Sequence, residues 1–185
     1  MMKKHFIIFN IVVVCVFVFF KAKAQSTVDD KESARMFVQK FYDWSFVLFK
    51  TDYPKTKNQL SDQQIIMKHG KDFFGQDLRK ALENYYNTPT KDGDIGLDFD
   101  PFMAGQDYGV GYQTGNVKQL GNKFLVDVHD VKSGQPKGAV LAAPVEVTVE
   151  VVKEAGKWAI TNFLYPAELA NTNLLQLLKN EQKGK

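Results

Sequence analysis

The spacing of apolar residues changes from a helical to a strand period partway along this chain. Across about residues 28–50, large apolar side chains recur every three or four positions, among them Phe37, Phe41 and Trp44, which predicts a long amphipathic helix. Further on, Val145–Val151 alternates valine with polar residues, the pattern of a half-buried strand. Helices followed by a run of strands predict an α+β fold.

The remaining elements are predicted from the same two periods. Short gaps between the strands favour an antiparallel meander over parallel crossover connections. We expect the long aromatic helix to lie against one face of this sheet, because no other element is large enough to bury it. The other expected elements are helices at Gln63–His69, Asp72–Asn87 and Leu169–Leu178, strands at Asn116–Leu120, Phe124–His129 and Trp158–Tyr165, and a loop at Thr51–Gln59.

The first twenty-four residues have the features of an export signal. Lys3 and Lys4 precede the apolar run Phe6–Phe20, and Ala22-Lys23-Ala24 has the small-x-small pattern of a cleavage site. The apolar run is shorter than the roughly twenty residues that span a bilayer, which favours a cleaved signal over a membrane anchor. We therefore expect a single domain, residues 25–185, in the periplasm or cell envelope, with no transmembrane helix in the mature chain.

Removal of this signal would change both the cysteine content and the charge. Cys15 is the lone cysteine, so a mature chain without it excludes disulfides, thiol catalysis and cysteine-ligated zinc. Four lysines leave with the signal, so that twenty Lys and Arg face twenty-one Asp and Glu. A near-neutral chain argues against nucleic acid or an anionic membrane as a partner, and no motif indicates a cofactor.

An Asp-rich stretch is the strongest candidate for a site. Asp92, Asp94, Asp98 and Asp100 fall close together, and Asp107 follows shortly after. Alternate carboxylates suit a hard cation such as Ca²⁺, but the glycine and glutamate of a helix-loop-helix calcium site are missing from the required positions. No metal site is therefore assigned to this stretch.

The favoured interpretation of the same stretch is structural. Asp98 or Asp100 would cap the turn around Pro101, while Phe99 and Phe102 would anchor the loop in the core. The alternative is a polar cluster that contacts a ligand or partner. Its members would be Asp98, Asp100, Gln106 and Asp107.

Asp127 and His129 form a second candidate. Two positions apart on a strand, they share one face, and Glu146 or Glu150 could lie across from them. A carboxylate beside a histidine can make a general base. The alternation of the strand nevertheless places both side chains on the solvent side, so no catalytic residue is assigned.

Three segments resemble known proteins. A long N-terminal helix, further helices and a sheet ending in "GKWAITNFLYP" resemble the cystatin-like, nuclear transport factor 2-like cone fold. The segments "LDFDPFMAGQDY" at Leu97–Tyr108 and "FVQKFYDW" at Phe37–Trp44 look like the exported bacterial domain-of-unknown-function family 3828. The resemblance implies a cone fold and export. That family has no established activity, so the resemblance supplies no catalytic residue.

These observations favour a non-enzymatic binding or interaction module of the cell envelope. Its partner would be a protein or a small envelope ligand, and the sheet offers a surface for a possible homodimer. Two alternatives stay open. One is an isomerase- or dehydratase-type enzyme with a pocket between helix and sheet, and the other is a periplasmic inhibitor or immunity protein.

Overall fold

The computed structural model describes residues 29–48, 61–88, 97–105, 109–166 and 172–183. The predicted export signal and the predicted loop at Thr51–Gln59 lie outside the described residues. No helix of the described part is long and apolar enough to cross a membrane.

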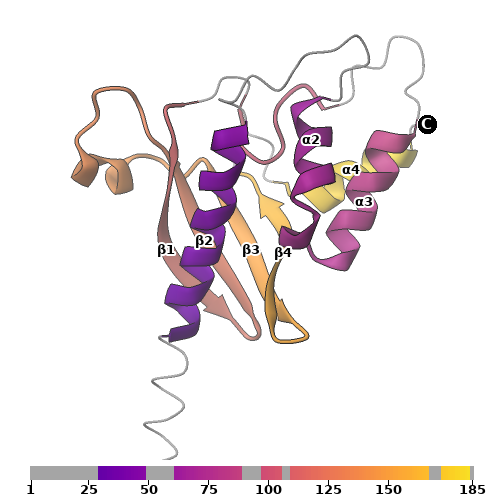
Figure 1. Cartoon of the computed structure of the whole chain (residues 1–185), viewed down its shortest axis with the longest axis horizontal. Helices are drawn as coiled ribbons and strands as arrows, with labels where there is room; N and C mark the ends of the chain where they lie inside the picture. The colour runs from indigo at the N-terminus through magenta and orange to yellow at the C-terminus, as the bar shows by residue number, and fades with distance from the viewer. Residues whose placement is uncertain (1–28, 49–60, 89–96, 106–108, 167–171, 184–185) are drawn as a thin grey trace, which may run out of the picture.

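Four antiparallel strands form one sheet (Figure 1). The strands follow one another in space as they do in sequence, which confirms the predicted meander. They are β1 (Tyr112–Leu120), β2 (Lys123–Asp130), β3 (Val147–Glu154) and β4 (Lys157–Leu164).

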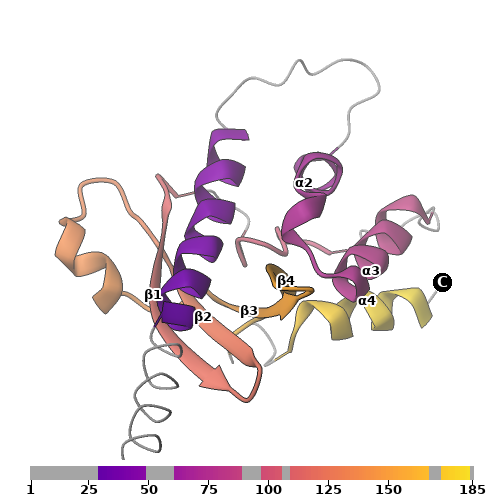
Figure 2. The same cartoon turned by 60° about the horizontal axis from the view of Figure 1, so that its bottom comes forward.

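Helices cover one face of the sheet and its β4 side. The N-terminal helix, described over residues 29–48 and indigo in Figure 1, lies across the sheet face. Figure 2 shows the other three helices together beyond β4. These are α2 (Asp62–His69), α3 (Gln76–Asn87) and α4 (Leu174–Lys183), with a short 3₁₀ helix, η1 (Lys71–Phe73), between α2 and α3. The α+β class and the helix packed on an antiparallel sheet are as predicted and are consistent with a cone-like fold.

The strand periodicity separates the two faces of the sheet. Val126 and Val128 of β2 and Val147, Val149 and Val151 of β3 have no exposed surface. Because alternate residues point to opposite faces, the polar residues between these valines form the face turned away from the N-terminal helix. We call that second face the outer face.

Aromatic rings fill the space between the helix and the sheet. Phe41 is fully buried, and its ring lies 5.6 Å from that of Phe74 and 6.1 Å from those of Phe102 and Phe163. Trp44 packs against this cluster but is only half-buried. The rings come from four separate segments, so this cluster joins the N-terminal helix, the residue after η1, the turn at Phe102 and β4.

Several element boundaries differ from the predictions, among them those of β3, which covers Val147–Glu154 rather than Val145–Val151. β1 begins at Tyr112 rather than Asn116, because its first half also pairs with β2. α3 begins at Gln76 rather than Asp72, since Lys71–Phe73 forms η1 and Phe74 is extended. α4 continues to Lys183, five residues beyond its predicted end at Leu178, while its predicted start at Leu169 lies outside the described residues. Polar residues and glycines near these ends weaken the apolar period on which the predictions rested.

The β3–β4 hairpin contains a correctable source of strain. Its two central residues, Ala155 and Gly156, have φ values of 49° and 80°. This left-handed conformation is unfavourable for alanine, whereas asparagine adopts it at a lower cost in free energy. Ala155→Asn is expected to raise the free energy of unfolding by about 0.5–1 kcal/mol, measured by urea denaturation. Ala139→Asn, at an exposed alanine without a positive φ, is the control. Equal effects of the two substitutions would contradict the assigned turn.

Candidate functional site

Asp100 holds the turn that follows it. Its Oδ1 accepts hydrogen bonds from the backbone amides of Phe102 at 2.8 Å and Met103 at 3.1 Å, and its Oδ2 accepts one from Gln63 Nε2 at 3.0 Å. The Asp100 side chain is buried, with 6% of its surface exposed. The prediction that an aspartate caps the turn around Pro101 is therefore confirmed for Asp100.

Two tyrosine hydroxyls from different segments donate hydrogen bonds to the same turn. Tyr42 of the N-terminal helix donates to the Phe102 carbonyl, and Tyr165, just after β4, donates to the Pro101 carbonyl, each at 2.7 Å. Burial raises the pKa of both phenols, and the nearby Asp100 carboxylate raises each further. The turn is thus bonded to the first helix and the last strand at once, which makes it part of the scaffold.

High pH should unfold the protein through these phenols. Burial raises the pKa of Tyr42, Tyr86, Tyr112 and Tyr165 above the usual value of about 10. The folded state therefore holds these protons more tightly than the unfolded state, so their stabilising contribution is complete below pH of about 10 and is lost as the pH rises further. We expect the tyrosinate absorbance of these four residues to appear together with the loss of circular dichroism. Ionisation of all tyrosines near pH of about 10, with the fold intact, would contradict this expectation. Titration of the urea-unfolded protein gives the reference pKa of the exposed tyrosines.

Of the other members of the predicted polar cluster, the structure describes only Asp98. Asp98 is exposed, while Gln106 and Asp107, like Asp92 and Asp94, lie outside the described residues. Within the part of the chain that the structure describes, no three His, Cys, Asp or Glu side chains are grouped to hold a metal ion.

The structure corrects the prediction that His129 faces solvent. The side chain lies on the outer face, but only 3% of its surface is exposed. The segment between β2 and β3 folds back over it, and His129 Nδ1 lies 3.0 Å from the Ala143 carbonyl and 3.2 Å from that of Pro144. Because carbonyls only accept, Nδ1 is the protonated nitrogen that donates to them. His129 therefore fastens this loop to the sheet.

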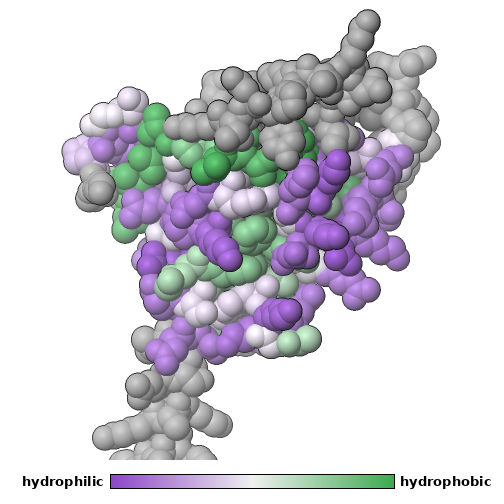
Figure 3. Space-filling model, viewed as in Figure 1, coloured by the Kyte–Doolittle hydropathy of each residue, from purple (hydrophilic) through white to green (hydrophobic). Residues whose placement is uncertain are grey.

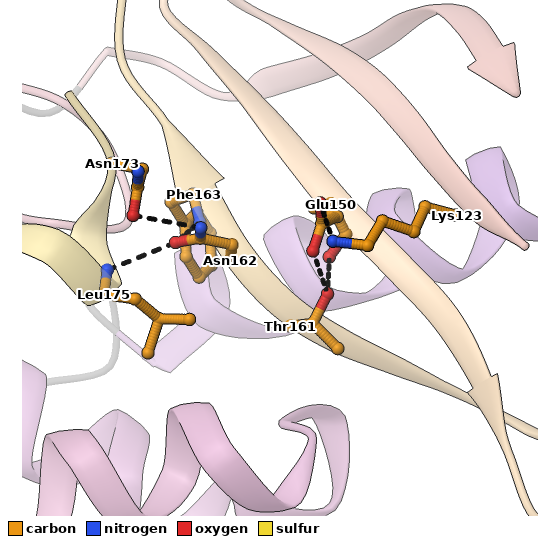
Figure 4. A network of polar contacts seen from close by, with 7 residues as sticks. All are labelled: Lys123, Glu150, Thr161, Asn162, Phe163, Asn173 and Leu175. Atoms are coloured by element: carbon orange, nitrogen blue, oxygen red, sulfur yellow. Dashed lines mark hydrogen bonds and ion pairs between the residues drawn. The ribbon is translucent and has the colours of Figure 1, made fainter. Parts of the chain in front are cut away.

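Asp127 does not join His129 in a catalytic pair. It is half-buried on the outer face and accepts a hydrogen bond from Thr148 Oγ1 across the strands at 3.1 Å. The predicted partner Glu150 lies farther along the face, where it accepts from Thr161 Oγ1 at 2.8 Å and pairs with Lys123 Nζ at 2.9 Å (Figure 4). These contacts join neighbouring strands and leave each carboxylate with a structural partner.

The polar contacts continue from the sheet to α4. Asn162 of β4 donates to Asn173 Oδ1 at 3.1 Å and accepts from the Leu175 amide at 3.2 Å (Figure 4). Asn173 Oδ1 also accepts from the Gln176 amide at 3.0 Å, so it satisfies an amide at the start of α4. This network positions the last helix on the sheet.

An exposed apolar segment is a feature that the sequence analysis missed. The 3₁₀ helix η2 (Lys137–Ala142) protrudes beside β1 and β2. Val140 is buried, whereas Leu141 is 51% exposed and Val110, which precedes β1, is 47% exposed. Figure 3 shows apolar atoms gathered at the upper left, over η2 and the neighbouring end of β1. We call Ala139, Leu141, Ala142 and Pro144, all exposed, the η2 patch. Its sequence signal is the uncharged stretch 138–145.

Asp130 has a buried carboxylate oxygen that the sequence did not indicate. Its Oδ1 is buried without a hydrogen-bond partner in the described structure. A Cβ built on Gly109 would lie only 1.7 Å from that oxygen, so the backbone passes directly against the carboxylate. The glycine at position 109 is therefore needed for close approach, and the oxygen is closed off rather than presented to a ligand.

Comparison with known proteins gave no match to a protein-family model, to a curated protein or to a solved structure. The geometry of the chain itself is therefore the basis for a proposed function.

Proposed function

We propose that the protein is an exported, non-enzymatic binding module of the cell envelope, and that its partner is another protein. The observation that carries this proposal is the η2 patch. Exposed apolar side chains grouped on a protruding segment are typical of sites of protein–protein contact. The stretch 138–145 contains no charged residue, and charge depletion is characteristic of the centre of an interface.

The arrangement of the interior supports binding over catalysis. An isomerase- or dehydratase-type enzyme would need an open pocket with ionisable groups between the helix and the sheet. In the described residues, Phe41, Phe102 and Phe163 are fully buried against one another in that space. The candidate pair Asp127 and His129 lies on the opposite face of the sheet. An inhibitor or immunity protein would be one form of the proposed module.

Export is supported by the basic start, the apolar run Phe6–Phe20 and the Ala22-Lys23-Ala24 pattern. The resemblance to family 3828 agrees with the same location. If the protein is exported and cleaved after Ala24, the intact mass of protein purified from the envelope should equal that of Gln25–Lys185. A mass that includes residues 1–24 in a membrane fraction would argue for an uncleaved anchor instead.

Site-specific crosslinking tests the proposed contact. A photoreactive amino acid placed at Leu141 should give a discrete crosslinked protein in the envelope of the producing cell. Met36 is the matched control, because it is 60% exposed and apolar but lies on the N-terminal helix. Crosslinking at Leu141 and not at Met36 would support the proposal. No crosslink at Leu141, or the same products from both positions, would contradict it.

A further inference from the structure

A side chain, rather than a strand, occupies the outer edge of β1. Gln39 Nε2 donates to the Tyr112 carbonyl at 2.9 Å, and Gln39 Oε1 accepts from the Thr114 amide at 2.8 Å. The same oxygen also accepts from Thr114 Oγ1 at 3.0 Å. One amide side chain thus uses the donor and the acceptor that a neighbouring strand would use.

The register of β1 shows that these backbone groups point away from the sheet. Alternate residues of an edge strand direct their N–H and C=O groups inward and outward. Gly111 is an inward residue, since its carbonyl accepts from the Val131 amide at 2.9 Å, and Gln113, two residues on, is inward by the same alternation. Tyr112 and Thr114 are therefore outward residues, whose edge groups would be unpaired without Gln39.

The opposite edge of the sheet is covered by backbone instead. Phe74 forms a bridge with Ile160 of β4, and the Gly75 amide donates to the Ile160 carbonyl at 2.8 Å. At the β1 edge, the outward backbone groups are instead bonded by side chains of the N-terminal helix. Arg35 adds a longer contact there, from Nη1 to Thr114 Oγ1 at 3.4 Å.

The edge at Tyr112–Thr114 is complementary to itself. A two-fold axis through Gln113 would place Tyr112 opposite Thr114 of a second copy, and Thr114 opposite Tyr112 of that copy, so that both pairs exchange hydrogen bonds. The central pair would be two uncharged Gln113 side chains, with no like-charge repulsion of the kind that protects many edges. We propose that Gln39, by occupying these backbone groups, prevents β1 from pairing with β1 of a second copy.

Removal of the Gln39 amide tests the proposal. Gln39→Ala is expected to raise the dimer association constant at least about tenfold over wild type, since each protomer exposes two strand-pairing groups that the dimer then satisfies. Sedimentation velocity over a concentration series measures this change. Gln176→Ala removes the same amide from an exposed position on α4 and is expected to sediment as wild type. Adding Thr114→Pro to Gln39→Ala deletes the outward N–H and should restore the monomer.

Hydrogen exchange at the Thr114 amide gives an independent readout. In Gln39→Ala this amide should exchange at least about tenfold faster at low protein concentration, and should recover protection as dimer forms. Gln39→Asn, whose shorter amide cannot span both groups, is the second variant if the alanine variant folds poorly. Monomers of both variants at every concentration would overturn the proposal. A dimer that persists after Thr114→Pro would also overturn it, because pairing would not involve this edge.

Discussion

Phe102→Ala is expected to lower the free energy of unfolding by about 3–5 kcal/mol. Phe102 is fully buried, and its ring lies 5.6 Å from Phe74 and 5.3 Å from Phe163. Because these neighbours belong to different segments that are fixed by their own backbone pairing, no single movement can fill the space left by the ring. The cost therefore includes both the lost burial and the remaining cavity.

Urea denaturation measures this loss, and Phe99→Ala provides the control in the same turn. Phe99 is half-buried and its ring makes a T-shaped contact with that of Tyr165, with the ring centroids 5.3 Å apart, so its truncation should cost about 1–2 kcal/mol. Equal losses for the two variants would contradict the central position of Phe102. An unchanged m-value in both variants would show that the denatured state is unaffected.

The segment Leu97–Tyr108 contains residues with structural roles. Asp100, Pro101 and Phe102 of this segment each have a structural partner: two backbone amides, a tyrosine hydroxyl or the aromatic cluster. The described contacts of these three residues are therefore explained by the fold. Search for a functional surface should therefore begin outside this turn, at the η2 patch.

Local patterns were sufficient to predict most of the fold. The alternating valines of β3 determine which residues face the helix, and the observed burial follows that pattern. Ser61 and Gln64 bond to each other's backbone at the start of α2, where a helix was predicted. The cap by Asp100 spans only two and three residues. Each of these interactions lies within one segment, so the sequence displays both partners together.

Interactions between distant segments could not be predicted in the same way. Gln39 bonds the outward groups of the β1 edge, and its partner Thr114 is 75 positions away. No local sequence pattern around either residue indicates that the two are in contact. His129 follows the expected alternation, yet it is buried because carbonyls 14 and 15 positions later lie over it. Strand periodicity reports the face of a residue but not what covers that face. The predicted solvent position was wrong for this reason.

Asp100→Ala is expected to lower the free energy of unfolding by about 3 kcal/mol. The substitution leaves the amides of Phe102 and Met103 without the carboxylate that accepts from them. Both residues are buried, so water cannot replace the lost acceptor without opening the turn. The Met103 amide keeps only its longer bond to the Asp100 backbone carbonyl at 3.3 Å, and an unsatisfied buried donor such as the Phe102 amide is costly. Urea denaturation measures the loss, and Asp98→Ala, at an exposed position beside it, should cost about 0.5 kcal/mol or less.

Asp100→Asn separates a structural role from a role in binding. The asparagine oxygen can still accept from both amides, and Gln63 can turn its own amide to accept from the new NH₂ group. We therefore expect a loss of only about 1 kcal/mol, with the crosslink from Leu141 unchanged. If the asparagine variant were as unstable as the alanine variant, the charge itself would be required and the capping explanation would fail. If the asparagine variant were stable but no longer gave the crosslink from Leu141, Asp100 would belong to the contact surface. That result would support the polar-cluster alternative over the capping role.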